Sequence, residues 1–478
     1  MELESIIGIE IHVQLKTKTK MFSRAPATFG EESNTQILPV DIALPGSLPV
    51  VNKEAVILAI KICSALNMEI AHTLYFDRKN YFYPDLPKGY QITQQFNPIG
   101  KNGKLELNLD SGEKLICTID NAHLEEDTAK QLHLDNMSFI NYNRAGIPLL
   151  EIVSNPDLHS GEEAMKYVET IREIVTYLNA SDGKMEDGSL RCDINISLKE
   201  KGSKKMGTKC EIKNLNSIQN IKDAVDFEIE RQKKIILSSN KVESETRRYD
   251  EKLKQTVLLR KKTSAVDYKY FREPNIVPID LDEELIYDAI HTMNKLPSQY
   301  RVELSNLGLN NYEINELLRE QDITIYYDEL IKRGADYKIL WNFLLGDIKA
   351  YLNKNESKID SLKFSKNSLV TFVSLVKENK INSKQAKEIL EEMLTSGKKP
   401  DVIISEKGIE QINSSSEIEK IVDVVINENE NAINEYKNGK DHAFSYLVGQ
   451  VMKLSKGKAN PNIAKELLIS KIGDYFKK

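Results

Sequence analysis

The stretch that decides the fold is HLEEDTAKQLHLDNMSFINYNRAGIPLLEIVSNPD, residues 123–157. Near its start are three consecutive acids, Glu125, Glu126 and Asp127, and near its end is an apolar run, Ile147–Val153, that contains one carboxylate, Glu151. The length and branched side chains of this run are typical of a strand buried on both faces. An ionised carboxylate in such a strand is costly unless a cation compensates it. Two cations can do so: Arg144, in a structural ion pair, or a metal ion.

Three other segments alternate strictly between apolar and polar residues, which predicts strands with one apolar face. They are IIGIEIHVQL (6–15), LRCDINISL (190–198) and TKCEIKNL (208–215). Their polar sides carry Glu10 and His12, then Arg191 and Asp193, then Glu211 and Lys213. A solvent-facing sheet surface is one interpretation. Because acids and bases recur on all three strands, the floor of a polar cleft is the interpretation that we favour.

Other elements follow from periodicity and turn residues. Apolar residues at helical spacing predict helices at 53–67, 161–180 and 218–237, and a core helix at 339–348. Residues 99–120 predict a hairpin with GKNGK as its turn. The loop at 76–95 mixes tyrosines with Arg78, Lys79 and Lys88, a composition that suits base stacking and phosphate binding. The alternative is a loop whose aromatic side chains cover the core.

Bulk composition restricts the class of protein. A chain of 478 residues is expected to form two to four domains. Four cysteines without CxxC spacing, no signal peptide and no membrane-length apolar run indicate a cytoplasmic protein with reduced thiols. A net charge of −6 restricts nucleic-acid contacts to local basic patches and gives no indication of DNA binding. GxxxxGK[ST], GxGxxG, HExxH and GxSxG are all absent from the sequence.

The polar side chains themselves indicate a chemistry. Carboxylates with an adjacent imidazole suit a magnesium ion that also contacts substrate phosphate. Arginine and lysine side chains suit phosphate oxygens. Metal-assisted phosphoryl transfer on an open sheet is therefore the predicted chemistry. The candidate oxygen donors are Glu10, Glu125, Glu151, Asp193 and Glu211, and His12 can supply a nitrogen. The candidates for phosphate oxygens are Arg144, Arg191, Lys213, Arg247, Arg248 and Arg260.

Long motifs in the chain resemble the B subunits of the bacterial aspartyl/glutamyl-tRNA(Asn/Gln) amidotransferases, the GatB/GatE family. The resemblance extends from one end of the chain to the other. The motifs are GIEIHVQL (8–15), FDRKNYFYPDLPKGYQITQ (76–94), HLEED (123–127), NYNRAGIPLLEIV (141–153), GSLRCDINIS (188–197), EIKNLNS (211–217), ETRRYDE (245–251), DYKYFREP (267–274) and YLVGQVMKLSKGKANP (446–461).

The resemblance implies a function. Members of this family use ATP and magnesium to phosphorylate the side-chain carboxylate of mischarged Glu-tRNA(Gln) or Asp-tRNA(Asn). Ammonia from the separate amidase subunit then displaces the phosphate, and a small third subunit makes the complex a heterotrimer. The enzyme class implied is a glutamine-hydrolysing carbon–nitrogen ligase. The fold implied is α+β: a glutamine-synthetase-like antiparallel-sheet cradle, an all-α helical domain and a small helical tail domain, at residues 1–292, 293–405 and 406–478.

The resemblance also implies site residues. Glu10, His12, Glu125 and Glu151 become catalytic, and with Asp193 they hold magnesium and its waters. Lys79, Arg191 and Arg247 are expected to contact oxygens of ATP or of the acyl phosphate. Glu125 is in addition expected to deprotonate incoming ammonium. In the tail the resemblance favours tRNA contact, whereas charge alone favours a solvated surface. The tail residues are Lys453, Lys456, Lys458 and Asn460.

One departure from the family concerns zinc. Many members carry two cysteine pairs near the N-terminus that bind zinc. Here Ser23 and Ala25 occupy the first pair's positions, and Leu38 and Asp41 occupy the second pair's positions. A thiolate site cannot form from these residues, so no zinc is expected.

Two alternative functions remain open on the sequence alone. One is a non-catalytic tRNA-binding scaffold in the same complex. The other is a free-standing ligase that acts on a small amino acid.

Overall fold

The computed structural model describes residues 2–261, 267–408, 414–437, 440–455 and 458–475. These residues form a mixed α+β protein with two compact units, Met1–Val302 and Glu303–Lys478. The first unit is built on a large sheet, and the second is helical. Within the described ranges no helix has both the length and the apolar character needed to span a bilayer.

The main sheet contains nine strands in the part of the chain that is described. Its neighbours are antiparallel except for one parallel pair, β12 with β13, so the expected antiparallel sheet has one exception. In spatial order the strands are β14 (Gln255–Lys261), β13 (Glu245–Asp250), β12 (Cys210–Lys213), β11 (Leu190–Glu200), β1 (Leu3–Gln14), β10 (Pro148–Ser154), β7 (Lys114–Glu126), β6 (Gly100–Asn108) and β2 (Glu69–Ile70).

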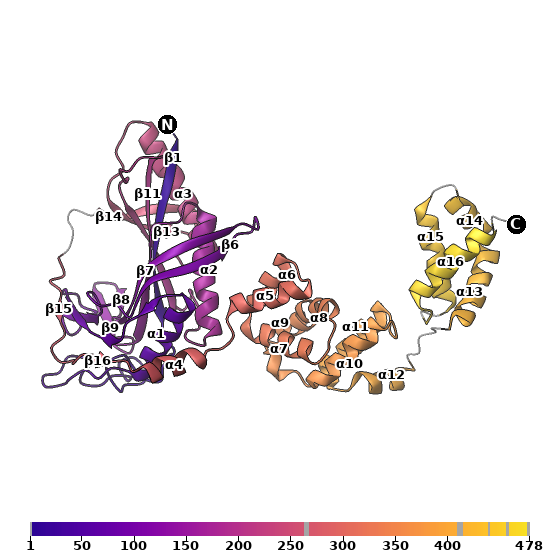
Figure 1. Ribbon diagram of the computed structural model, residues 1–478, viewed down its shortest axis with the longest axis horizontal. Helices are drawn as coiled ribbons and strands as arrows, with labels where there is room; N and C mark the ends of the chain where they lie inside the picture. Colours follow the sequence, from indigo (N-terminus) through magenta and orange to yellow (C-terminus); the bar gives the residue numbers. More distant parts are fainter. Residues whose placement is uncertain (1, 262–266, 409–413, 438–439, 456–457, 476–478) are drawn as a thin grey trace. The chain divides into compact units, whose positions relative to one another are not determined.

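The apolar face of this sheet is covered by helices. Ile7, Ile9, Ile11 and Val13 of β1 are at most 1% exposed and belong to one core with residues of the helices. Figure 1 shows α2 and α3 along this side of the long strands. The helices of the first unit are α1 (Lys53–Ala65), α2 (Gly161–Tyr177), α3 (Ile218–Leu237) and α4 (Glu283–His291), followed by α5 (Pro297–Leu307) at the boundary. The three helices predicted in this unit are therefore confirmed.

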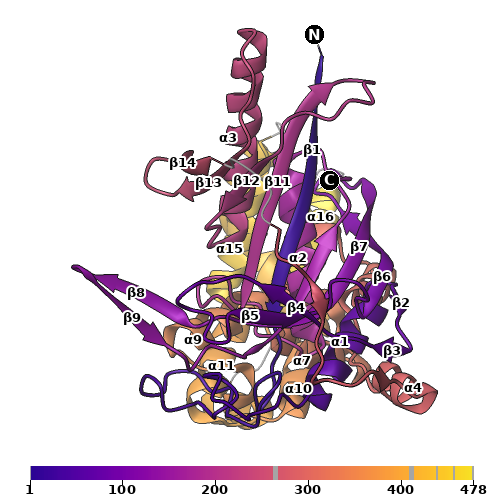
Figure 2. The same cartoon turned by 90° about the vertical axis from the view of Figure 1, so that its left-hand side faces the viewer.

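Smaller sheets accompany the main sheet. The ribbon of β8 and β9 extends away from it in Figure 2. The small sheets are β15 (Phe271–Arg272) with β4 (Asp77–Asn80) and β5 (Tyr90–Thr93), β16 (Ile279–Asp280) with β3 (Thr73–Leu74), and β8 (Lys130–Leu134) with β9 (Met137–Asn141).

The hairpin predicted at 99–120 exists, but the predicted position of its turn is wrong. GKNGK lies within β6, and the chain turns instead near Gly112, whose N–H donates to the carbonyl of Leu109. The glycines of GKNGK serve close packing. A Cβ on Gly100 would lie 2.6 Å from Cys63 Sγ, and one on Gly103 would lie 2.8 Å from Met68 Cγ. From the sequence alone, a glycine that is required in a turn cannot be distinguished from a glycine that is required for close packing.

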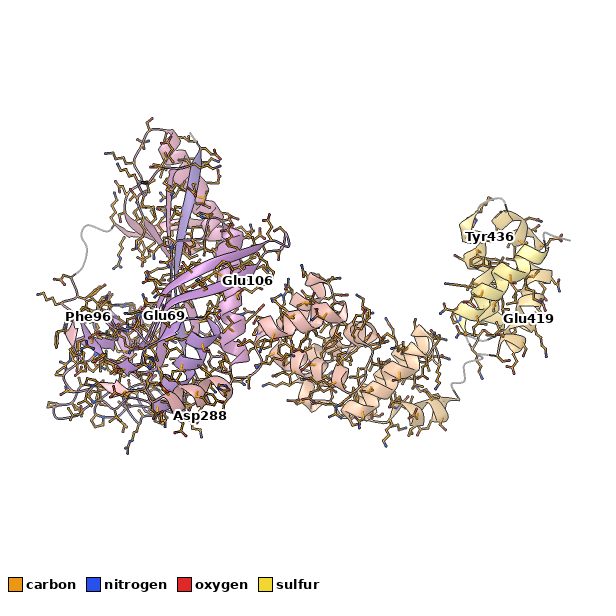
Figure 3. All side chains as sticks on the ribbon, viewed as in Figure 1. Glu69, Phe96, Glu106, Asp288, Glu419 and Tyr436 are labelled. Atoms are coloured by element: carbon orange, nitrogen blue, oxygen red, sulfur yellow. The ribbon has the colours of Figure 1, made fainter. Side chains whose placement is uncertain are left out.

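The second unit is helical, and its last helices share an apolar core. Figure 3 places Glu419 and Tyr436 in the last group of helices, α13 to α16, which share the apolar core around Val422 and Leu468. The predicted core helix at 339–348 is α8 continued by a π-helical turn, η1. The helices are α6 (Asn311–Leu318), α7 (Gln321–Lys332), α8 (Tyr337–Phe343), η1 (Leu344–Ile348), α9 (Lys349–Lys354), η2 (Ile359–Ser361), α10 (Lys366–Lys377), α11 (Ser383–Ser396), α12 (Pro400–Lys407), α13 (Ser415–Glu428), α14 (Glu430–Lys437), α15 (Asp441–Leu454) and α16 (Pro461–Tyr475).

The positions at which zinc is not expected lie in the loops between β1 and α1. Asp41 is buried and lies 3.7 Å from the ammonium of Lys20, which is fully buried and also donates to the carbonyl of Tyr142 at 3.2 Å. Burial lowers the pKa of Lys20, against the attraction of Asp41. An ion pair thus anchors this loop.

Replacing Asp41 by asparagine is expected to lower the free energy of unfolding by about 1–3 kcal/mol, because the buried Lys20 ammonium loses its counter-ion. Urea unfolding of the variant measures the loss. The matched control is Asp182→Asn, which removes an exposed partner of Lys16. Equal stability of the Asp41 variant and the wild type would show that the pair does not anchor the loop.

The cysteines are all buried and unpaired. Burial raises the pKa of Cys63 and Cys117 to about 12 and that of Cys210 to about 11. Burial also raises the pKa of Cys192. We therefore expect no thiol to react within minutes with an aromatic disulfide reagent at pH 8, and all four to react in denaturant. Rapid reaction of any thiol in the native protein would contradict this burial.

Candidate functional site

The polar face of the sheet brings residues of four strands into one row. His12 of β1 lies opposite Arg191 of β11 on one side and opposite Glu151 of β10 on the other. Glu151 in turn lies opposite His123 of β7. Glu125 follows two residues after His123, so both side chains are on the same face of β7. Strand register therefore assembles the site from distant parts of the sequence.

The centre of this row is a cluster of two carboxylates and two imidazoles. Glu151 Oε2 lies 3.4 Å from His12 Nε2 and 3.1 Å from His123 Nε2. Glu125 Oε1 lies 3.7 Å from His12 Nε2. One ligand atom from each of His12, Glu125 and Glu151 lies within 4.8 Å of the other two. We call these three residues the metal-type cluster.

Electrostatics couples the groups of the metal-type cluster. Burial opposes protonation of His12, but Glu151 and Glu125 prevail and raise the pKa of His12 to about 9. The pKa of His123 is also raised by Glu151, against burial. The two imidazoles hold the pKa of Glu151 well below its usual range in spite of burial. Burial and the repulsion of Glu151 raise the pKa of Glu125. The raised pKa of both imidazoles and the lowered pKa of Glu151 show that the paired carboxylates create a site that favours positive charge.

Glu10 and Asp193 lie in the next row of the same face, where they are cross-strand partners. Glu10 Oε1 accepts a hydrogen bond from Asn195 Nδ2 at 2.9 Å, and burial together with repulsion from Glu151 and Asp193 raises its pKa. Asp193 is paired with Lys213, whose ammonium also lies 3.2 Å from Glu211. The structure therefore places these predicted residues beside the metal-type cluster and not within it.

Arg144 is not the partner of Glu151, and this sequence-based alternative is wrong. Its Nε donates to Asp127 Oδ2 at 2.6 Å. The same oxygen accepts a hydrogen bond from Arg191 Nη2 at 3.0 Å. The basic groups that contact Glu151 are the two histidines, because the register of β10 places it between them.

Lys79 of β4 reaches the site from the small sheet. Its ammonium lies 5.0 Å from the ring centroid of Tyr268. Glu125 raises its pKa, although burial opposes this. Lys79 is thus a charged group beside the metal-type cluster. The prediction of one loop at 76–95 is wrong, because this segment contains the strands β4 and β5, which pair with each other.

Arg247 is directed away from the polar face. A register shift between Thr246 and Arg247 interrupts the pairing of β13 with β14. The Arg247 guanidinium donates to Thr256 Oγ1 at 3.0 Å, to the Thr256 carbonyl at 2.9 Å and to Glu245 Oε2 at 2.6 Å. It also lies 3.5 Å from the fully buried Glu228 of α3. The structure does not bring Arg247 to the other predicted phosphate ligands.

The predicted tail residues lie at the junction of α15 and α16. Lys453 and Lys458 are exposed. Asn460 is buried, and its side-chain oxygen accepts a hydrogen bond from the N–H of Asn462 at 3.0 Å at the start of α16. Lys456 lies outside the described residues.

The sequence-based prediction did not include two residues of the site, His123 and Asp127. His123 lies on the face of β7 that carries Glu125, two residues before it, and Asp127 follows Glu125 by two residues just beyond the end of β7. That spacing is a usable signal for His123. Nothing in the sequence indicates that Asp127 pairs with both Arg144 and Arg191, because these arginines come from two other segments of the chain.

The fold and the site define a class: an α+β enzyme that holds a carboxylate–histidine cluster of metal-binding type on the open face of a sheet. Residues 5–287 match the GatB/GatE catalytic domain, and residues 325–472 match the GatB domain. The chain belongs to the GatB/GatE family.

Curated relatives extend over nearly the whole chain, and each is named as the B subunit of an aspartyl/glutamyl-tRNA(Asn/Gln) amidotransferase. The Mycoplasma mycoides protein is 46% identical over 471 residues, covering 98% of each chain. The Oceanobacillus iheyensis protein is 44% identical over 477 residues, covering 99% of this chain and all of its own. The Bacillus cereus protein is 44% identical over 473 residues, covering 99% of each chain.

Proposed function

We propose that the polar face of the main sheet is the kinase and transamidase site of a tRNA-dependent amidotransferase. Family membership gives this chain the role of the B subunit, which acts on mischarged Glu-tRNA(Gln) or Asp-tRNA(Asn). The observation that carries the site assignment is the convergence of His12, Glu125 and Glu151 from three strands. The product is Gln-tRNA(Gln) or Asn-tRNA(Asn) for protein synthesis.

The chemistry of the donor set fits a divalent cation. Two carboxylates and one imidazole nitrogen lie close enough to share one ion, and carboxylates with substrate phosphate are the environment that magnesium prefers. We propose His12, Glu125 and Glu151 as direct ligands, with Glu10 and Asp193 holding water molecules from the next row. When bound, magnesium would neutralise phosphate charge on ATP.

The protein groups around the cluster have distinct proposed roles. Lys79, Arg191 and Lys213 are cations on or beside the polar face, and we propose that they orient phosphate oxygens of ATP. For Arg247 we propose instead a structural role between β13 and α3.

The chemical steps require a leaving group and a base. The carboxylate oxygen of the aminoacyl side chain takes the γ-phosphoryl group, and ADP leaves. Ammonia then forms the C–N bond while the bond from carbon to the phosphate oxygen breaks. Burial and the repulsion of Glu151 raise the pKa of Glu125, and we propose that its carboxylate accepts the proton that ammonium loses.

Several finer features belong to the same proposal. The first unit is a glutamine-synthetase-like cradle, residues 1–292. A helical domain (293–405) and a tail domain (406–478) extend the chain toward tRNA. The partners are the amidase subunit, which releases ammonia from glutamine, and the small third subunit of the heterotrimer. The complex is cytoplasmic and binds no zinc through this chain.

Reconstitution with the amidase and the small partner tests the function. We expect release of radiolabelled phosphate from γ-labelled ATP only when a mischarged tRNA is present, and amidated aminoacyl-tRNA as the product. A complex in which Glu10→Gln keeps full tRNA-coupled ATP hydrolysis would favour the scaffold alternative. Amidation of a free amino acid without tRNA would favour the small-substrate ligase.

Deleting residues 406–478 is expected to weaken tRNA binding by about tenfold or more, because it removes the exposed Lys453 and Lys458. Glutaminase activity of the complex should persist, since α13 to α16 have their own apolar core. Filter binding measures the tRNA affinity. Unchanged affinity would refute a tRNA-binding tail.

A further inference from the structure

Asp127 is a buried carboxylate that holds two arginines. It is 5% exposed and follows the last residue of β7. Its backbone is fixed to the start of β10, because its N–H donates to the Ile147 carbonyl at 2.8 Å and its carbonyl accepts from the Gly146 N–H at 2.9 Å. Oδ1 accepts from the Thr128 N–H at 2.9 Å. Oδ2 is therefore presented in a fixed position to the Nε of Arg144 and the Nη2 of Arg191.

One carboxylate is insufficient to neutralise two guanidinium groups. The trio of Asp127, Arg144 and Arg191 carries a net charge of +1, since arginine stays protonated. Neither arginine has a second acidic partner among the described residues. The Nε of Arg191 is buried and has no hydrogen-bond acceptor there. A structural ion pair requires one arginine only. The second arginine, and the guanidinium N–H group that has no acceptor, therefore indicate that a further anion binds here.

Both arginine side chains are partly accessible, although Arg191 Nε itself is buried. The side chains of Arg144 and Arg191 are 34% and 39% exposed, whereas that of Asp127 is 4% exposed. The carboxylate therefore lies beneath, and the two guanidinium groups lie toward solvent. Their outer nitrogens are free to bind oxygen atoms in pairs, which is the geometry by which arginine recognises phosphate.

The trio borders the metal-type cluster. Arg191 is the cross-strand partner of His12, and its charge acts on that imidazole against the carboxylates. Asp127 follows Glu125 by two residues, just beyond the end of β7. An anion bound by the two arginines would thus lie next to the place proposed for the metal.

We propose that Arg144 and Arg191, aligned by Asp127, bind the terminal phosphoryl oxygens of ATP, and that Asp127 is a positioning residue. This inference rests on the proposed function, because it requires nucleotide on the polar face. A phosphoryl group is favoured over a carboxylate because two guanidinium forks offer more donors than a carboxylate has oxygens, whereas a terminal phosphoryl group has three oxygens to share between them.

Calorimetric titration of the reconstituted complex with ATP and with AMP tests this assignment. Arg144→Gln and Asp127→Asn are expected to weaken ATP binding roughly tenfold to a hundredfold, because a charge-assisted contact is lost. AMP binding should change less than about twofold, since AMP lacks the terminal phosphates. Arg144→Lys should be intermediate, because an ammonium keeps the charge and loses the fork.

The control is Asp226→Asn, which removes one exposed aspartate from a lysine pair on α3 and should leave both affinities unchanged. Because Arg144 is partly exposed, its variants are informative even if Asp127→Asn fails to fold. Unchanged ATP affinity in the Arg144 variants, or equal losses for ATP and AMP, would overturn the inference. So would a raised KM for aminoacyl-tRNA at unchanged ATP affinity. If the wild type bound no ATP, the proposed function itself would fail first.

Discussion

Replacing Glu151 by glutamine is expected to reduce tRNA-dependent phosphate release by at least about a hundredfold. Glu151 contacts both His12 and His123 and shares the metal-type cluster with Glu125. A neutral amide keeps the shape of the side chain but removes one of the two negative charges that would hold a divalent ion. Phosphate release from γ-labelled ATP, measured with saturating mischarged tRNA, gives the size of the loss.

The matched control is Glu106→Gln. Glu106 lies on β6 of the same sheet (Figure 3), is half-exposed and pairs with Lys114 at 2.8 Å. This variant should keep phosphate release within about twofold, because an exposed ion pair contributes little. Glutaminase activity in the complex should be retained in both variants, since the amidase performs that reaction. Wild-type phosphate release by the Glu151 variant would remove the basis for the proposed site.

Replacing Arg247 by alanine is expected to lower the free energy of unfolding by about 1–3 kcal/mol, because Glu245 and Thr256 lose a buried charge-assisted donor, while Glu228 keeps Arg231 as its closer cation. Arg247 bonds to Glu245 and Thr256 and approaches Glu228, which is completely buried. Denaturation should be followed by circular dichroism of the first unit's secondary structure. The single tryptophan, Trp341, lies in the second unit and would not report the change.

The adjacent Arg248 provides the control for this second variant. Its side chain is 43% exposed and lies 3.3 Å from Asp250. Arg248→Ala should cost less than about 1 kcal/mol. If Arg247→Ala were as stable as the wild type and instead lost affinity for ATP, then the sequence-based prediction of a phosphate ligand would be favoured over the structural role.

These two arginines show what the sequence can and cannot predict. The strict alternation of residues 6–15 and 190–198 is enough to predict strands with a polar face, and β1 and β11 confirm it. Alternation in ETRRYD (245–250) cannot decide which arginine faces the cleft. That choice depends on the register of β13 with β12, which places Arg247 beside the buried Ile212 and Arg248 beside Lys213.

The composition of the cluster illustrates the same limit. Glu125, Glu151 and His12 are predicted to lie together, and their spacing is short in the structure. The position of His123 beside Glu151 requires the register of β7 with β10. To predict that Asp127 is the partner of Arg144, one must know the path of the chain between β9 and β10. Local alternation predicts on which face of a strand a side chain lies. Which side chains become its neighbours on adjacent strands depends on how distant segments pair.

The most direct measurement is a crystal of the complex soaked with ATP and manganese, with manganese standing in for magnesium. We expect an anomalous difference peak within coordination distance of His12, Glu125 and Glu151, with the triphosphate beside it. A manganese peak elsewhere on the chain, with Glu151 still paired only to its two histidines, would contradict the assignment of this site.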